Sequence, residues 1–132
     1  MTTTQLADIV AKAIPAWQQG KHPATRSFQA IRIAVNHELA DLELGLAQGL
    51  EVLSVGGRLL VISFHSLEDR LVKQFMQYQE NREEIPANLP IKHADIKIHF
   101  KRIGHAIKAS MQEIAENPRA RSAILRIGEK LS

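Results

Sequence analysis

Residues 58–64 read RLLVISF, and this uninterrupted apolar run narrows the possible folds more than any other part of the chain. A continuous apolar strand, unlike an alternating one, is typical of a strand covered on both faces, as in a parallel sheet. Gly56-Gly57 precede it as a turn, and an acidic helical sequence begins directly after it at His65-Ser66. We therefore expect an α/β domain in which this strand is internal.

Helical periodicity precedes the strand. A first helix, capped by Thr3 or Thr4, is expected to end before residue 15, which is a proline. A longer helical segment follows up to residue 53, because apolar residues recur in it every three or four positions. Gly45 and Gly49 lie inside this segment, and each costs about 1 kcal/mol relative to alanine in a helix interior. We therefore expect a bend at these glycines or two consecutive helices.

Helix and strand signals also alternate after the strand. Ser66, with Asp69 three residues later, resembles a capping box for the helix that follows. The pattern further predicts strands over 96–101 and 122–127, and a short helix over 110–116 that Ser110 and Glu113 would cap.

Composition excludes several classes of site. The 132 residues contain no cysteine, which excludes disulfides and thiolate metal sites and suits a cytoplasmic protein. No apolar run approaches the ~20 residues that cross a membrane. The six histidines are scattered without carboxylates at metal-ligand spacing, so we expect no metal. The expected location is cytoplasmic.

Charge is unevenly distributed along the chain. The net charge is +3, but residues 86–132 carry nine basic and four acidic side chains, a local charge of +5. A basic segment of this kind is compatible with a polyanionic partner, because Lys and Arg neutralise phosphates. A solvated basic face is the alternative.

His65 and Ser66 form the first candidate site. In open α/β sheets, ligands are held at the carboxyl ends of the strands, and a helix N-terminus there favours an anionic or carbonyl oxygen. The alternative is structural, with Ser66 as a cap and His65 as a turn residue. A hydrolase that uses these two residues is remote, because no orienting carboxylate can be identified from the sequence.

His22, Thr25, Arg26 and Gln29 form the second candidate site. A rigid His-Pro loop that carries Thr25 and Arg26 into a helix start could clamp a phosphate, with Arg26 supplying a bidentate contact. The alternative is an ordinary linker in which Thr25 or Ser27 caps the helix.

Arg119 and Arg121 form the third candidate site. On an extended segment, residues two apart project to the same side, which suits a grip on a nucleic-acid backbone. The alternative is a solvated pair that partners Glu113 or Glu116. The chain lacks both G-x-G-x-x-G and a P-loop, and Gly56-Gly57 precede a strand instead of following one.

Three longer blocks together resemble one family: HPATRSFQAIRIAVNHEL, GGRLLVISFHSLEDRLVKQF and ENPRARSAILRI. They resemble the bacterial S-adenosylmethionine-dependent methyltransferases that modify N4 of a cytosine in 16S ribosomal RNA. The resemblance covers nearly the whole chain and is weakest over 80–110. It implies the C-terminal part of a Rossmann-like methyltransferase fold, with residues 1–20 as the tail of a helical insertion and 21–132 in the methyltransferase domain.

The resemblance also implies roles for the candidate sites. Residues 58–64 resemble the family's fifth strand, and the two later strands resemble the antiparallel pair at the edge of its sheet. His65 and Ser66 would then lie at the rim of the catalytic cleft, near the target base. The remaining candidates, His22, Thr25, Arg26, Gln29, Arg119 and Arg121, would line that cleft or contact RNA.

The family's N-terminal half, with its glycine-rich cofactor loop, has no counterpart in these residues. We therefore expect that the chain alone binds no S-adenosylmethionine and is not a competent enzyme, although the family protein is. The exposed edge of strand 58–64 predicts a homodimer or a swapped assembly. The alternative is a module without catalysis, derived from that fold, that binds ribosomal RNA or oligomerises.

Overall fold

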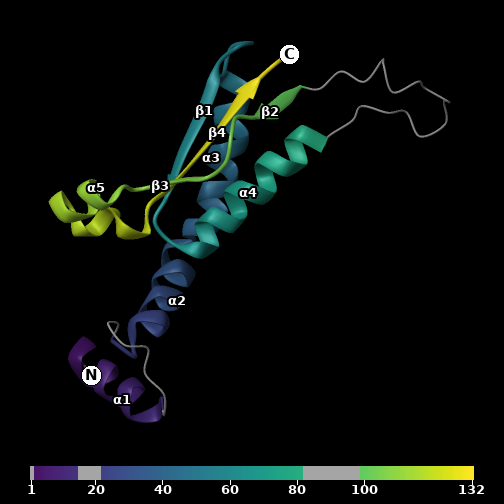
Figure 1. Cartoon of the computed structure of the whole chain (residues 1–132). Helices are drawn as coiled ribbons and strands as arrows, with labels where there is room; N and C mark the ends of the chain where they lie inside the picture. Colours follow the sequence, from purple (N-terminus) through teal and green to yellow (C-terminus); the bar gives the residue numbers. More distant parts are fainter. Residues whose placement is uncertain (1, 15–21, 82–98) are drawn as a thin grey trace. The chain divides into compact units, whose positions relative to one another are not determined.

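A computed structural model describes residues 2–14, 22–81 and 99–132 of the chain (Figure 1). Two compact units contain them, residues 1–38 and 39–132. The elements are helices α1 (Thr3–Ala13), α2 (Thr25–Asn36), α3 (Glu38–Val52), α4 (Ser66–Asn81) and α5 (Met111–Glu116), the 3-10 helix η2 (Pro118–Ser122), and strands β1 (Arg58–Ser63), β2 (Phe100–Arg102), β3 (Ile107–Lys108) and β4 (Ile124–Lys130).

Helix α1 begins with a capping box one residue earlier than the sequence pattern predicts. The N-cap is Thr2, whose Oγ1 accepts a hydrogen bond from the Gln5 amide, while Gln5 Oε1 accepts one from the Thr2 amide at 2.8 Å. The prediction of Thr3 or Thr4 as the cap is therefore wrong. Thr2 has a glutamine three residues later, which is the residue type that completes the box.

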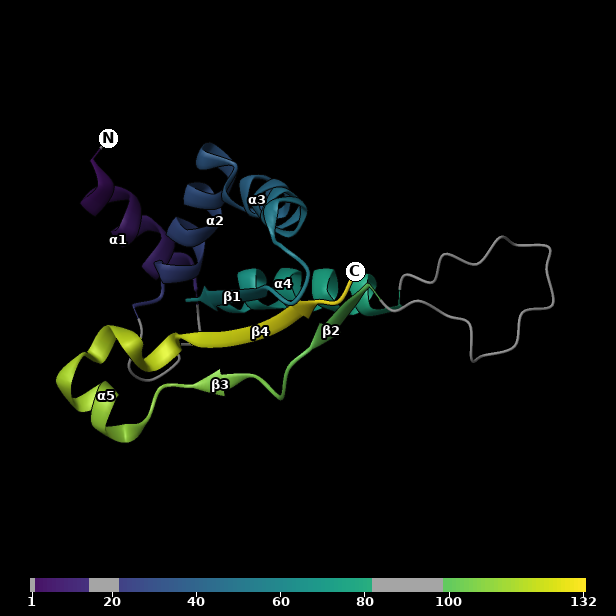
Figure 2. The same ribbon diagram turned by 90° about the horizontal axis from the view of Figure 1, so that it is seen from above.

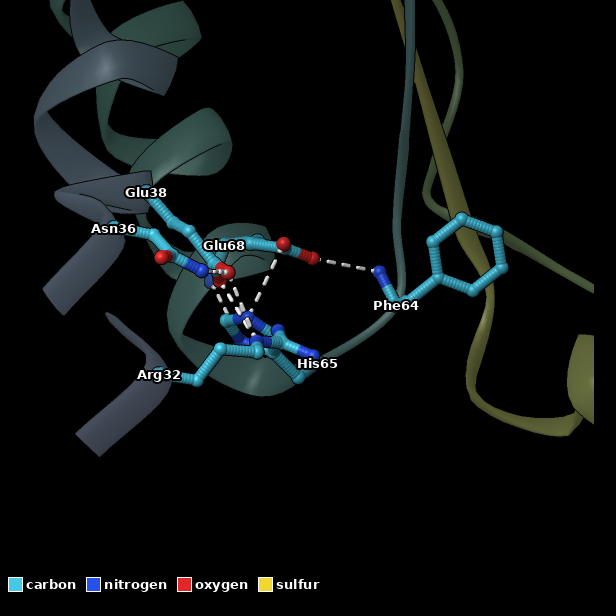
Figure 3. A network of polar contacts seen from close by, with 6 residues as sticks. All are labelled: Arg32, Asn36, Glu38, Phe64, His65 and Glu68. Atoms are coloured by element: carbon cyan, nitrogen blue, oxygen red, sulfur yellow. Dashed lines mark hydrogen bonds and ion pairs between the residues drawn. The ribbon is translucent and has the colours of Figure 1, made fainter. Parts of the chain in front are cut away.

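The long helical segment does divide in two, but not at its glycines. Helix α2 ends at His37, which has the left-handed backbone conformation (φ 54°). Across this break the Glu38 carboxylate accepts hydrogen bonds from Arg32 Nε at 3.1 Å and Asn36 Nδ2 at 3.2 Å (Figure 3). Helix α3 then runs without interruption through Gly45 and Gly49. Of the two expected alternatives, two consecutive helices are therefore confirmed, and a bend at the glycines is not seen.

The second unit is built on an antiparallel sheet with strand order β1-β4-β2 (Figure 2). In register, Val61 of β1 lies opposite Arg126 of β4, and Lys101 of β2 lies opposite Glu129. The short strand β3 also pairs with β4. The expected antiparallel pairing of β2 with β4 is confirmed, but with other bounds: β2 begins at Phe100 and β4 at Ile124. Residues 96–98 of the predicted strand lie outside the described residues.

We expected residues 58–64 to form an internal strand that is covered on both faces. Among the described residues this expectation is not met. Strand β1 pairs with β4 on one side, and no other described strand lies beside it. Leu59 and Val61 face the core, whereas Leu60 and Ile62 are 58% and 59% exposed. Successive side chains point to opposite faces of a strand, so the apolar run covers one packed face and one open face.

The core lies between the packed face of the sheet and the helices α3 and α4. It consists of Leu46 from α3, Val72 and Met76 from α4, and Phe100 from β2. Helix α4 packs against all three long strands. A glycine turn precedes β1, as predicted. Gly56 has φ 79°, and the Gly57 amide donates to the Ser54 carbonyl at 2.8 Å.

Helix α5 follows its predicted start. Ser110 is the N-cap; its hydroxyl accepts from the Glu113 amide at 3.2 Å, and its own amide donates to Glu113 Oε2 at 2.7 Å. The Ser110 amide first, and the Ser110 hydroxyl second, hold the pKa of the Glu113 carboxyl below its ordinary value of 4.5. None of the described helices is long and apolar enough to cross a membrane.

Candidate functional site

His65 lies at the point where β1 passes into α4, and it caps that helix (Figure 3). Its Nδ1 accepts a hydrogen bond from the Glu68 amide at 3.3 Å, and its carbonyl accepts one from the Asp69 amide. Glu68 Oε2 in turn accepts from the Phe64 amide at 2.8 Å. The predicted Ser66–Asp69 capping box is therefore wrong, because the cap is formed one residue earlier by the His65 ring.

This cap determines the tautomer of the neutral His65 ring. Because Nδ1 accepts a hydrogen bond, the proton of the neutral ring lies on Nε2. Nε2 is 3.1 Å from Glu68 Oε1, and the His65 side chain is only 14% exposed. In this arrangement Nδ1 is held by the helix start, and Nε2 lies beside the Glu68 carboxylate. Ser66 is exposed in the first turn of the helix.

Asp69 anchors the same helix start to the sheet, a contact that the sequence analysis missed. Its two carboxylate oxygens accept hydrogen bonds from Arg126 Nε at 2.7 Å and Arg126 Nη2 at 3.0 Å. Both side chains are 18% exposed. The partners are 57 residues apart, so no local pattern could reveal the pair, although an acidic residue in a first helical turn is itself favourable.

His22 and its neighbours build the start of α2 in the first unit. His22 Nδ1 accepts from the Ala24 amide at 3.2 Å, and its carbonyl accepts from the Thr25 amide. No side chain caps α2, so neither Thr25 nor Ser27 has the capping role considered as the alternative. Thr25 and Arg26 are exposed, and each is within four positions of the half-buried Gln29, which places the three on neighbouring parts of one helix surface.

Arg119 and Arg121 lie in the 3-10 helix η2 and not on an extended segment. With three residues per turn, positions two apart point in different directions, so the predicted projection to the same side is wrong. Both side chains are exposed. Neither forms an ion pair with a described residue, so the alternative of a pair with Glu113 or Glu116 is not seen either.

The predicted site residues fall in both units. His22, Thr25, Arg26 and Gln29 belong to residues 1–38, whereas His65, Ser66, Arg119 and Arg121 belong to residues 39–132. Within the second unit, His65 and Ser66 are at the β1–α4 connection, and the two arginines are in the segment between α5 and β4.

The described residues do not fit an S-adenosylmethionine site by themselves. A Rossmann-like sheet admits a nucleoside cofactor through a glycine-rich turn from a strand into a helix. The two strand-to-helix connections described, 64–65 and 109–110, contain no glycine, and Gly56-Gly57 enter β1 instead of leaving it.

Comparison with known proteins finds relatives over the whole chain. The family described as the MraW methylase family matches residues 1–131. The chain is 57% identical over 132 residues to ribosomal RNA small subunit methyltransferase H of Marinomonas sp. (strain MWYL1), and 59% identical over 131 residues to the protein of that name from Legionella pneumophila (strain Paris). These alignments cover 100% and 99% of the chain but only 42% of each relative, so the chain spans about 42% of their length.

Proposed function

Because the chain belongs to the MraW methylase family, we propose that it is part of an enzyme that transfers a methyl group from S-adenosylmethionine to N4 of a cytosine in 16S ribosomal RNA. The observation that carries this proposal is the family match over residues 1–131. It is supported by 57–59% identity to relatives named as methyltransferases of small-subunit ribosomal RNA. A cytoplasmic location belongs to the same proposal.

The chain is proposed to be the C-terminal part of a Rossmann-like methyltransferase domain. Residues 1–20 would be the tail of a helical insertion, and residues 21–132 would belong to the domain itself. The mixed helix-and-sheet architecture supports this, as does the antiparallel pairing of β4 with both β1 and β2. Strand β1 would be the fifth strand of the complete sheet.

His65 and Ser66 are proposed to lie at the rim of the catalytic cleft. In the described geometry His65 Nδ1 accepts from the Glu68 amide and Nε2 lies 3.1 Å from the Glu68 carboxylate, which supports a positioning role for the ring at the α4 start. His22, Thr25, Arg26 and Gln29 are proposed to contact RNA or line the cleft, and Arg119 and Arg121 are proposed to contact the RNA backbone.

The chain alone is proposed to be inactive. Methyl transfer requires the sulfonium of the donor and the exocyclic amine to be aligned in one pocket. The chain spans 42% of its relatives' length, and its strand-to-helix connections lack the glycines of a cofactor turn. The donor half of the pocket would therefore come from the remainder of the full-length protein.

A second candidate function is an oligomerising or RNA-binding module without catalysis. The open face of β1, with Leu60 and Ile62 more than half exposed, favours association. Among the described strands, only β4 pairs with β1, so its other edge presents backbone donors and acceptors. For the chain alone we propose a homodimer or a swapped assembly over this edge.

Calorimetric titration with S-adenosylmethionine tests the proposal. The chain alone should not bind, and binding should appear after a separately produced remaining portion of a family member is added. Tight binding by the chain alone would contradict the proposal that the chain is inactive by itself. If no binding appears after the remaining portion is added, the methyltransferase assignment is contradicted. Light scattering measures the molar mass of the chain and so tests the dimer. A monomeric mass at micromolar concentration would exclude it.

The non-catalytic module predicts a different result. Binding to ribosomal RNA should then be strongly salt-dependent without any cofactor affinity in the complemented sample. The double variant Arg119→Ala, Arg121→Ala should lose that binding. RNA binding that is unchanged in this variant would exclude both arginines from the RNA contact.

A further inference from the structure

A recess of about 390 Å³ lies in the second unit, between α4 and the segment that joins β2 to β3. Lys73 and Met76 of α4 line one side, and Arg126 and Ile127 of β4 also contribute. The other side is formed by Arg102 at the end of β2 and by the connecting residues 103–106. None of the sites discussed above includes this recess.

The charge of the lining is one-sided. Lys73, Arg102 and Arg126 are cationic, and none of the lining residues carries a carboxylate. Two acidic side chains hold the arginines from outside the lining. Arg102 Nε donates to Glu80 Oε2 at 2.5 Å, and Asp69 binds Arg126 through Nε and Nη2.

These ion pairs orient the arginines without using all of their donors. A guanidinium has five N–H donors in a planar fork, and a carboxylate bound at Nε and Nη2 leaves Nη1 directed away from it. Arg126 is 18% exposed and Arg102 is 37% exposed, so both side chains are held largely against the protein. Lys73 is exposed and adds a cation that can adjust its position.

The β2–β3 connection leaves room for a ligand to approach the backbone. Gly104 has φ 65°, and no atom lies within 4 Å of the position that a Cβ would occupy there. His105 follows it and is also exposed. Backbone amides in a turn next to cationic side chains form a favourable environment for an anion.

We propose that this recess binds a phosphate group. Glu80 and Asp69 pair with two of the three cations from outside the lining, but Lys73 and the arginine N–H groups that these carboxylates do not use remain to favour an oxyanion, and arginine forks match the tetrahedral oxygens of phosphate. The volume is at the lower end of the range for ligand sites, which suits a phosphate with one attached nucleoside. The phosphate belongs to an RNA strand. This choice of source, but not the phosphate site itself, rests on the proposed function.

Amide NMR spectra of the full chain, titrated with inorganic phosphate at constant ionic strength, test the site. Saturable shifts are expected at Gly104 and His105. Lys73→Ala should weaken the affinity by about 3- to 10-fold, because one charge-assisted contact is lost from an exposed site. Lys101→Ala is the matched control, because Lys101 is also exposed but, as the neighbour of Arg102 in β2, points to the opposite face of the sheet.

The absence of saturable shifts, or an equal loss in Lys73→Ala and Lys101→Ala, overturns the site. A second titration uses a single-stranded RNA oligonucleotide without a terminal phosphate. Shifts of the same amides, reversed by inorganic phosphate, support RNA as the source; no shift at Gly104 with RNA overturns that source. Neither titration involves a methyl donor, so failure of methyl transfer and failure of this site give separate results.

Discussion

Gly128 of β4 is expected to be intolerant of any side chain. A Cβ built at this position would contact the ring of Phe100, with Cζ nearest, Cε1 at 2.6 Å and Cε2 at 2.9 Å. Phe100 is 1% exposed and belongs to the core between the sheet and α4. The ring therefore occupies the space directly over the Gly128 backbone, and Gly128→Ala must displace it.

The expected cost follows from this geometry. Overpacking of a core costs about 1–3 kcal/mol, and the ring that is pushed aside also loses part of its packing. We expect the free energy of unfolding to fall by about 3 kcal/mol in Gly128→Ala, which corresponds to a decrease in Tm of roughly 6–12 °C. Gly45→Ala is the control. No atom lies within 4 Å of its Cβ position, so this helix-interior change should stabilise the chain by about 0.5–1 kcal/mol.

Urea denaturation followed by circular dichroism measures both variants, and a double-mutant cycle isolates the cause. Phe100→Leu shortens the obstructing side chain, so Gly128→Ala should cost at least about 1 kcal/mol less in that background. The reasoning is refuted if Gly128→Ala has the denaturation midpoint of the parent chain. It is equally refuted if the cost of the substitution is the same with leucine at position 100.

Two further predictions concern ionised side chains. Asp69→Ala should lower the free energy of unfolding by about 1–3 kcal/mol, because the largely covered Arg126 guanidinium loses its carboxylate; an unchanged urea midpoint would contradict this. The pKa of Glu113 should lie below 4.5 in carbon-13 NMR, first because the Ser110 amide donates to its carboxylate and second because of the Ser110 hydroxyl. Ser110→Ala keeps the amide and removes the hydroxyl, so the pKa should rise only part of the way toward 4.5; a pKa unaffected by the change would exclude the hydroxyl as a contributor. Because the folded-state pKa is lowered, the stabilising contribution of Glu113 is present above the unfolded pKa and is lost as the pH falls through the folded pKa.

Local signals in the sequence predict local structure well in this chain. The glycine turn, the start of β1 at Arg58 and the Ser110–Glu113 cap each depend on residues within four positions of one another. The prediction failed at the start of α4, where Ser66 was expected to be the cap. The His65 ring caps the helix instead, by accepting from the Glu68 amide, while the Glu68 carboxylate accepts from the Phe64 amide.

The candidate site was predicted only as a set of residue types. His65 at the β1–α4 connection follows from the order of strand and helix, so its place in the fold was predictable. Its ring orientation was not, because it depends on which amide meets Nδ1. The 3-10 conformation of η2, which turns Arg119 and Arg121 apart, was likewise hidden in a segment with few periodic residues.

By itself, the sequence determined the family, the order of the helices and strands apart from β3 and η2, and the apolar character of residues 58–64. Only the tertiary structure decided that this strand has a packed face and an open face, that Asp69 holds Arg126, and that Phe100 covers Gly128. Those outcomes depend on strand register and on contacts between residues far apart in the sequence, such as Asp69 and Arg126, which are 57 positions apart, and no local propensity specifies them. The open face of β1 illustrates this point. Its leucine and isoleucine are as apolar as core residues, but they are buried only if another surface packs on them.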